Sequence, residues 1–560
     1  MSPAPFALAL AALSIVTSGV RADSVVTNNA SDWYSTVAPF QTFHSNPDLE
    51  PPEFNILKYD EARVDANHTF LSYRGGNQPA PIIMDNNGSL VWSGGSQYGN
   101  SMDLIVQKYK GEDVLSFFQG SFYKGGYGLG YWTMLSTNYT SIRNVSTLNQ
   151  TTDTADFHEF VITDNDTALV ESWRLTQADL TGANGTTDGW TWDCVFQEVD
   201  ISGETDSLLF EWRSLEHVSP AETYFEVNDN GNSSDNAFDY CHINSVEKTN
   251  DGNYLVSMRG PSTIYHISAS TGEILWRLGG KNSNFSMEGN STFWYQHDAR
   301  LMNGQDITAS RFNISLFDNA AGGGTPAEAT ARALVLELDT DAMTATVVHE
   351  FFPSFGTTAP SQGSNQPLDN GNYFVGWGAV PYFSEYAADG TLLQDVAFGG
   401  SQQVVQSYRA FKQMWTGYPL TNPSLAVNGS SAYASWNGAT EVSSWVLLGG
   451  STEGNVTETV SNSTKNGFET NLGGFSGHSF LSVAAMSSNN TCLGVSNVYS
   501  TSSMSSTSTN GTCPSGSVAA ARGSGTSSSD AGTSGASSAR ALTGLALAIV
   551  GAAAAAVVSV

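Results

Sequence analysis

The sequence predicts an all-β fold, a six-bladed β-propeller of four-stranded antiparallel blades, and three observations support this. First, a hairpin unit recurs in which an apolar strand, a polar turn with glycine and a second strand ending near Trp or Phe follow one another. Its copies are PIIMDNNGSLVWSG (81–94), 195–212, TIYHISASTGEILWRLGG (263–280), 333–351 and 382–399, with a weaker copy at 134–145. Second, another hairpin precedes most copies. Third, helical periodicity of useful length is missing between the two ends of the chain.

The second hairpin consists of a strand, a D-x-G or N-G turn and an apolar strand, which is a typical hairpin signal. It occurs at 103–120, 157–174, HINSVEKTNDGNYLVSMR (242–259) and 365–378. Two hairpins make one four-stranded sheet, and radial repetition of such sheets gives a propeller. We count six pairs in residues 23–480 and expect the last blade to close through 433–449 and an N-terminal strand. An array of β-sandwiches is the structural alternative.

The two ends of the chain predict secretion and attachment to a membrane. Residues 1–22 are apolar and end in the small-x-small triplet VRA, which is typical of a secretory signal peptide. Residues 481–540 form a Ser/Thr/Gly-rich stalk with small residues at 529–532, and 541–560 form a hydrophobic tail. This order predicts a GPI-attachment signal, with a C-terminal transmembrane helix as the alternative. We therefore expect an extracellular protein on the cell surface.

Sequons and cysteines fit the secretory pathway. Asn-x-Ser/Thr sequons, which predict N-glycosylation, occur throughout the chain, among others at Asn67, Asn87, Asn138, Asn144, Asn184, Asn232, Asn290, Asn313 and Asn428. Four cysteines are too few for a disulfide scaffold. We expect Cys492 and Cys513 to pair, because they bracket one Ser/Thr-rich segment. Cys194 and Cys241 are either a second pair or two buried thiols.

The formal net charge of −31 argues against a nucleic-acid partner, because such a surface repels phosphates. An anionic substrate would need a local positive site. Three histidines stand at equivalent places, at the start of the first strand of successive blades: His158, His242 and His297. Arg259 ends the hairpin that His242 opens. Loops entering the inner strands of a propeller converge at its channel, so we expect these four residues to meet there.

Other chemistries find less support in the sequence. Three histidines suit zinc, but no His-x-His or His-x-x-x-His pair is present, and we expect neither a metal nor a cofactor. A Ser-His-Asp hydrolase would have a G-x-S-x-G elbow, which the chain lacks.

Several ordered motifs resemble the arylsulfotransferase family, and its fungal secreted branch is the most similar. They are FEWRSLEHVSP (210–220), DYCHINSV (239–246), TGEILWRLGG (271–280), QHDAR (296–300), SLFDN (315–319), 332–339, 372–386, SYRAF (407–411) and YASWNGATEV (433–442). The similarity spans about residues 40–470. Two positions depart from the family pattern, because Cys241 stands where an aromatic is common and Gly260 where bacterial members often have histidine.

The resemblance implies an activity and a site. Bacterial members are six-bladed propellers that move a sulfuryl group from an aryl sulfate to a phenol through a transiently sulfated histidine, without a nucleotide donor. By motif, the nucleophile would be His297, and His242, Arg259 and His158 would complete the pocket. Fixed cations suit such a transfer by analogy with phosphoryl transfer, whose transition state spreads charge over equatorial oxygens.

Further residues near these motifs are weaker candidates. We expect Tyr240 and Tyr295 to stack on the aryl rings of the substrates. Asn244 is a candidate contact to substrate, and either Asn244 or Asp298 would hold the tautomer of His297.

Two other functions remain as alternatives. One is a non-catalytic cell-surface propeller that binds glycans or phenolics. The other is a quinone-dependent oxidoreductase, because TGEILW is similar to the Trp-containing repeats of quinoprotein propellers. Acceptor-dependent release of a phenol from an aryl sulfate would separate the enzyme from the binding protein.

Overall fold

The computed structural model describes residues 39–123, 125–150, 154–322, 329–354, 359–400 and 404–519. The predicted signal peptide, the chain beyond residue 519 and the hydrophobic tail 541–560 lie outside these residues. Within them the protein is almost entirely β, so the all-β part of the predicted fold class is confirmed. The few helical segments are single turns: α1 (Gly95–Tyr98), η2 (Thr181–Ala183), η3 (Ser214–Glu216), η4 (Pro220–Glu222) and η5 (Ser234–Asn236).

Six sheets each contain a four-stranded antiparallel meander. The first has the order β26 (Ala410–Gln413), β2 (His68–Tyr73), β3 (Ala80–Met84), β4 (Leu90–Ser93). The second has β5 (Ser101–Tyr109), β6 (Glu112–Tyr123), β7 (Tyr127–Leu135), β8 (Ser141–Val145). The third has β9 (Phe160–Ile162), β10 (Thr167–Ala178), β11 (Gly189–Asp200), β12 (Ser207–Arg213).

The other three meanders follow in chain order. The fourth has β13 (Ile243–Lys248), β14 (Tyr254–Met258), β15 (Thr263–Ile267), β16 (Ile274–Gly279). The fifth has β18 (His297–Leu301), β19 (Arg311–Asp318), β20 (Arg332–Asp339), β21 (Thr344–Phe351), with β17 (Ser286–Met287) added at its outer edge. The sixth has β22 (Ser364–Pro367), β23 (Tyr373–Gly376), β24 (Tyr382–Tyr386), β25 (Leu392–Ala397), with β1 (Asn55–Tyr59) added outside.

The first strands of these sheets contact one another in a closed ring, in the order β26, β5, β9, β13, β18, β22 and back to β26. Each interface between neighbouring sheets holds its own cluster of buried apolar side chains. Because the middle strands are covered on both faces, β14 (YLVSM) and β15 (TIYHI) are buried along their whole length. This arrangement is that of a β-propeller.

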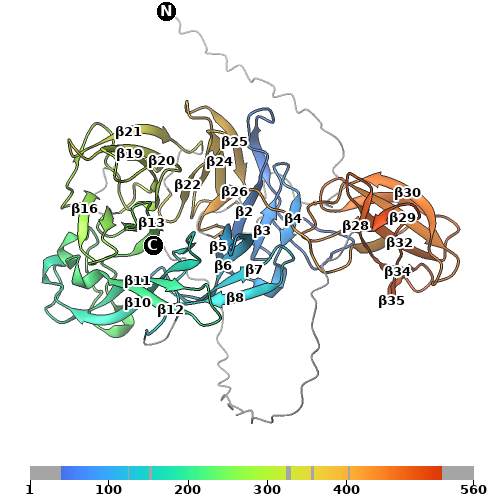
Figure 1. The fold of residues 1–560 in the computed structure, drawn as a ribbon, viewed down its shortest axis with the longest axis horizontal. Helices are drawn as coiled ribbons and strands as arrows, with labels where there is room; N and C mark the ends of the chain where they lie inside the picture. The colour runs from blue at the N-terminus through green and yellow to red at the C-terminus, as the bar shows by residue number, and fades with distance from the viewer. Residues whose placement is uncertain are drawn as a thin grey trace, which may run out of the picture.

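The ring closes differently from the sequence prediction. The short strand β26 pairs with β2, so a C-terminal strand completes the sheet that begins the ring, as Figure 1 shows where the gold β26 lies beside the blue β2. Residues 433–449, predicted to close the last blade, lie instead in β28 (Ser431–Ser435) and β29 (Ser444–Gly450) of a separate unit. Their apolar side chains pack into another core, which contains Trp445, Leu447 and Leu481.

This separate unit covers residues 424–519 and forms the orange to red part of Figure 1. Two sheets enclose its core. One sheet has β27 (Ser424–Asn428), β28 and β31 (Thr470–Gly474). The other has β30 (Glu458–Thr464), β29, β32 (Phe480–Met486), β33 (Thr491–Val495) and β36 (Val518–Ala519), with β34 (Asn497–Ser500) and β35 (Ser505–Asn510). The predicted boundary at residue 480 therefore falls inside a folded unit, and the predicted stalk begins with strands.

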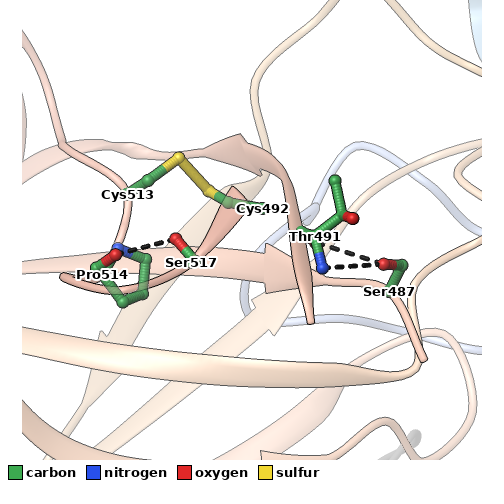
Figure 2. The surroundings of a disulfide bond; sticks show 6 residues. All are labelled: Ser487, Thr491, Cys492, Cys513, Pro514 and Ser517. Carbon is green, nitrogen blue, oxygen red and sulfur yellow. Dashed lines mark hydrogen bonds between the residues drawn. A yellow bond between two sulfur atoms is a disulfide. The ribbon is translucent and has the colours of Figure 1, made fainter. Parts of the chain in front are cut away.

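The cysteines divide into one disulfide and two thiols. Cys492 in β33 and Cys513 form the predicted disulfide, which Figure 2 shows next to Pro514 and Ser517. It holds the chain that enters β36 beside β33, with which β36 pairs. Cys194 and Cys241 are free and buried, so the alternative of two thiols is the correct one.

The nine sequon asparagines named above are all exposed or half-buried, and their glycosylation stays a prediction. Among the residues that the structure describes, no helix has the length and apolar composition that a membrane crossing requires.

Arg409 occupies the centre of the ring and is 2% exposed. It lies directly before β26, and its guanidinium is 2.6 Å from Asp103, 3.3 Å from Glu159 and 3.4 Å from Asp298. It also donates to the backbone oxygens of His158 and Asn244. These partners belong to four different sheets, so one side chain ties most of the ring together.

Burial alone would lower the pKa of Arg409, but Asp103, Glu159 and Asp298 together raise it well above its usual value. Arg300 adds a second positive charge, with contacts of 2.6 Å to Glu159 and 2.9 Å to Asp298. The centre of the ring is therefore a buried network in which each cation has several anionic partners.

We predict that Arg409→Met lowers the free energy of unfolding by about 3–5 kcal/mol, because removal of one partner leaves buried carboxylates uncompensated. Urea denaturation measures this loss. Arg311→Met is the matched control, because Arg311 pairs with Glu337 and Asp339 on the surface and such pairs contribute about 0–1 kcal/mol. Equal effects of the two substitutions would contradict the central role of Arg409.

Candidate active site

The three predicted histidines lie at the same end of neighbouring sheets. His158 comes just before β9, His242 comes just before β13, and His297 is the first residue of β18. Their side chains are buried, with 1–4% of each residue exposed. Arg259 directly follows β14 and lies beside His242. The backbone pairing of β13 with β14 extends to these two residues, because the Arg259 amide donates to the His242 carbonyl at 2.9 Å.

The side chains of these residues converge. The ring centroids of His158 and His242 are 4.7 Å apart, in an edge-on arrangement. The centroid of the Tyr408 ring lies 5.5 Å from that of His158 and 6.2 Å from that of His297, so Tyr408 connects these two histidines. The structure therefore brings all four predicted residues together at one end of the ring.

The orientation of His297 is fixed by Asn319, which follows β19 of the same sheet. The Asn319 amide nitrogen donates at 2.9 Å to the backbone oxygens of Ala359 and Gln362, so its oxygen must face His297. That oxygen lies 2.6 Å from His297 Nδ1, which therefore carries the proton. Nε2 is left with its lone pair and accepts from the backbone amide of Gln362 at 3.2 Å.

The charge state of His297 is set by its surroundings. Burial lowers its pKa well below the usual 6.5, and the positive charge of Arg259 lowers it further, against an opposing hydrogen bond from Asn319. His297 is thus neutral at neutral pH, with an unprotonated nitrogen, which is the form that acts as a nucleophile.

The other two histidines each pair with an aspartate. His242 Nδ1 lies 2.6 Å from Asp239, and burial together with His158 and Arg259 lowers the His242 pKa well below 6.5. Burial raises the pKa of Asp239 to about 7, although Arg259 opposes this. His158 Nδ1 bonds to Asp156. In both pairs the aspartate binds Nδ1 and so fixes the ring, and Nε2 is the nitrogen left to contact a substrate.

Arg259 is a buried cation with unused hydrogen-bonding capacity. It is 7% exposed, donates to the Pro360 carbonyl at 3.1 Å and stacks over Phe225 at 5.3 Å and Tyr295 at 5.7 Å. Within the described residues its Nε has no partner and no carboxylate lies within salt-bridge distance. Asp239 lies close enough to influence its charge but forms no salt bridge with it. A buried guanidinium without a salt bridge is suited to bind an anion from outside.

A hairpin tip approaches the cluster from the second sheet. Gly126, between β6 and β7, has a positive φ of 81°, and a Cβ added there would lie 3.3 Å from the His242 ring. Glycine at this turn therefore lets the backbone approach the histidine closely.

The weaker candidates are placed differently from one another. Tyr295 is buried against Phe225 and Arg259, at the edge of the cluster. Tyr240 belongs to the apolar core between the third and fourth sheets. Asn244 donates to the Gln296 carbonyl and joins neighbouring first strands.

The tautomer of His297 is held by neither residue that the sequence suggested. Asp298 bonds to Arg300 and lies near Arg409, while Asn244 is occupied by the Gln296 backbone. Asn319 holds the tautomer of His297 instead. Sequence reasoning also missed Tyr408, whose hydroxyl is buried without a partner among the described residues. Both had a signal, because SLFDN ends in Asn319 and SYRAF contains Tyr408.

One group in the described residues could hold a metal ion: Asp156, His158 and Glu171, all buried. Both carboxylate oxygens of Glu171 are without hydrogen-bond partners there, and burial raises its pKa well above 4.5. Asp156, however, already accepts from the backbone amides of Gly128 and His158.

Comparison with known families identifies the class of protein. The fold is a β-propeller, and the site is a buried histidine cluster with an unpaired arginine. The model of the arylsulfotransferase (ASST) family matches residues 105–399. This is more than half of the chain and includes all four predicted site residues. The chain belongs to this family, and this membership supports an aryl sulfotransferase activity. Curated protein sequences contain no match to the chain.

Solved structures with a similar fold are remote in sequence. A protein of unknown function from Bacteroides caccae has 12% identity and a TM-score of 0.36, covering 62% of this chain and 100% of its own. A catalytically inactive virginiamycin B lyase from Staphylococcus aureus has 7% identity and a TM-score of 0.31, covering 68% and 95%. A β-propeller domain from Myceliophteria thermophila has 10% identity and a TM-score of 0.27, covering 60% and 95%. These similarities are too low to indicate a function for this chain.

We predict that His242 and His297 titrate below pH 6.5, since burial and Arg259 disfavour their charged forms. Nuclear magnetic resonance of isotope-labelled histidine, assigned with His242→Gln and His297→Gln, measures both pKa values. Arg259→Met should raise them, because it removes the positive charge. The unfolded chain takes up these protons near pH 6.5 and the native state only at lower pH, so stability should fall as pH falls below 6.5. Midpoints at or above 6.5 would contradict this account.

Proposed function

We propose that the protein moves a sulfuryl group from an aryl sulfate to a phenol through a sulfohistidine at His297. The observation that carries this proposal is the fixed tautomer of His297, whose unprotonated Nε2 lies in a cluster with Arg259. Membership in the arylsulfotransferase family supports it independently.

In the first step, Nε2 of His297 attacks the sulfur of the aryl sulfate, and an N–S bond forms as the S–O bond breaks. The leaving phenolate takes a proton from the His242–Asp239 pair, in which Asp239, whose pKa burial raises to about 7, holds the proton and the neutral His242 ring passes it on. His158, held by Asp156, lies beside this pair. In the second step, the same pair takes the proton of the acceptor phenol, whose oxygen attacks sulfur and releases His297. Two easier steps thus replace one difficult step.

Arg259 serves both steps by stabilising negative charge. By analogy with phosphoryl transfer, the transition state spreads charge over three equatorial oxygens, which fixed donors stabilise. The free Nε of Arg259 is such a donor. Tyr408 supplies a second one, since its buried hydroxyl is also without a partner among the described residues.

We also propose that the six sheets of the ring are the six blades of one propeller. The closed order of the first strands and the apolar cluster in each interface support this. The unit of residues 424–519 is an addition to the propeller rather than part of its closure.

The decisive experiment uses 4-nitrophenyl sulfate as donor and phenol as acceptor. We expect acceptor-dependent release of nitrophenol, and a fall by about a thousandfold or more in His297→Ala, since loss of a nucleophile removes the pathway. With donor alone, the intact protein should gain the mass of one SO₃ group, located at His297. His349→Gln in β21, outside the cluster, is the matched control and should leave the rate unchanged.

Two other outcomes would point elsewhere. Release of nitrophenol without an acceptor would indicate a sulfatase. Absence of release from any aryl sulfate, with binding retained, would favour the non-catalytic binding protein.

We propose further that the protein is secreted and held on the cell surface by a GPI anchor, from the apolar residues 1–22 and the order of small, polar and apolar residues at the C-terminus. Phosphatidylinositol-specific phospholipase C should then release it from intact cells. Retention in the membrane after this treatment would favour a transmembrane tail.

A further inference from the structure

A second arginine occupies the position equivalent to that of Arg259 on the other side of the ring. Arg259 comes directly after β14, the second strand of its sheet, and Arg74 comes directly after β2, the second strand of the first sheet. In the ring order of first strands, β26 and β13 are three steps apart in either direction. The two arginines therefore stand at the same end of opposite sheets.

Arg74 resembles Arg259 in lacking an anionic partner. Its guanidinium lies 4.1 Å from the centre of the Phe122 ring, and its side chain donates a weak hydrogen bond to the sulfur of Met102 at 3.4 Å. Among the described residues, its buried Nε has no hydrogen-bond partner and no carboxylate is within salt-bridge distance. Burial lowers its pKa only to about 10, so it stays charged at neutral pH.

Two chains of contacts connect Arg74 with the histidine cluster. Through the backbone, Arg74 pairs with Gln406, whose side chain accepts from Gln362, the residue whose amide bonds to His297. Through aromatic rings, Phe122 lies 5.6 Å from Phe157, which lies 4.1 Å from His158. The contacts of Arg74 and Arg259 share no residue, so the two guanidinium groups are suited to two separate anions.

We propose that Arg74 binds a second anionic group on the substrate, so that the preferred donors or acceptors are aryl compounds carrying a carboxylate or second sulfate away from the reacting oxygen. This proposal rests on the proposed function of the histidine cluster. The aryl ring lies between the two arginines, on the side of Phe122 and Phe157.

The overall negative charge of the protein is a reason for a second cationic site. At −31 the protein repels a doubly charged anion, and each additional charge on the ligand increases this repulsion. Two guanidinium groups that no carboxylate of the described residues contacts, Arg74 half-buried and Arg259 buried, supply positive charge where the anion would bind. Their desolvation cost in the free protein is recovered when the anions arrive.

The first test is a binding measurement that needs no turnover. Isothermal titration calorimetry compares 3- and 4-sulfobenzoate, which carry a sulfonate and a carboxylate, with benzenesulfonate, which carries the sulfonate alone. We expect the wild-type protein to bind at least one sulfobenzoate about tenfold or more tightly than benzenesulfonate, the size of a charge-assisted hydrogen bond. Arg74→Met should abolish this difference and leave benzenesulfonate binding unchanged.

The matched control is Arg63→Met, because Arg63 is exposed and pairs with Asp60 on the surface. It should keep the full preference. Equal binding of all three ligands to the wild-type protein, or a preference that survives Arg74→Met, would overturn the proposal. Thermal denaturation checks folding, and Arg74→Met should barely change the melting temperature, because the removed charge has no carboxylate partner and its contacts with Phe122 and Met102 are weak.

Turnover distinguishes failure of this proposal from failure of the proposed function. With 4-nitrophenyl sulfate as donor, Arg74→Met should lower kcat/KM for 3- or 4-hydroxybenzoate by about tenfold or more and barely change it for phenol. Transfer to phenol with no effect of Arg74→Met on hydroxybenzoate would overturn the role of Arg74 alone. Absence of any transfer would remove the proposed function, while the calorimetric result would still decide whether a second anion site exists.

Discussion

The ion network around Arg409 is the constraint on which the rest of the structure depends. Neighbouring sheets pack through apolar clusters, but these clusters join the sheets only in pairs. At the axis, where the first strands meet, the contact is electrostatic, because Asp103, Glu159 and Asp298 come from three sheets and converge on an arginine from a fourth. Arg409 also donates to the His158 carbonyl, so the residue that closes the ring directly positions a member of the site.

The contrast between Arg409 and Arg259 separates structural from functional charge in this protein. Both are buried, but Arg409 has several anionic partners, whereas Arg259 has a carbonyl, two aromatic rings and an unpaired Nε. A buried charge without a partner is costly for folding, and proteins retain such charges where a ligand supplies the partner. Burial is the main reason why the pKa values of His242 and His297 are low, and the charge of Arg259 lowers them further, so this group contributes to both the anion site and the nucleophile.

Much of the ring could be predicted from the sequence, because both hairpin units carry local signals. Apolar alternation around turns such as TNDGN places β13 and β14 correctly. The same hairpin pattern places His242 and Arg259 beside each other. The closing strand β26 has only four residues and no turn of its own, so its partner is decided by the long-range ladder to β2. Residues 433–449 have a stronger local pattern, but it serves the core of the additional unit.

Composition also concealed part of the fold. Residues 480–519 are rich in Ser and Thr, which predicts a stalk, yet alternate positions Leu481, Val483 and Ala485 face a core. Within the site, the role of Asn319 depends on a contact between two sheets. Its amide nitrogen bonds to backbone oxygens next to another sheet, and this orients its oxygen toward His297. Sequence spacing carries no information on such a contact, and for this reason adjacent residues such as Asp298 were favoured instead.

Residues 359–363, directly before β22 and called the loop below, connect the resting structure with the proposed chemistry. Gln362 donates its amide to the lone pair of His297 Nε2, and Pro360 accepts from Arg259. If His297 is the nucleophile, sulfur must replace this amide hydrogen at Nε2, so a shift of the loop has to accompany the attack. The shift would free the Gln362 N–H and the Arg259 donor together, close to the three sulfuryl oxygens that require donors. The cost of breaking two resting hydrogen bonds is then offset by bonds to a charged group, which are roughly twice as strong as neutral ones. In this way the loop would keep His297 blocked until an anion arrives to replace its contacts.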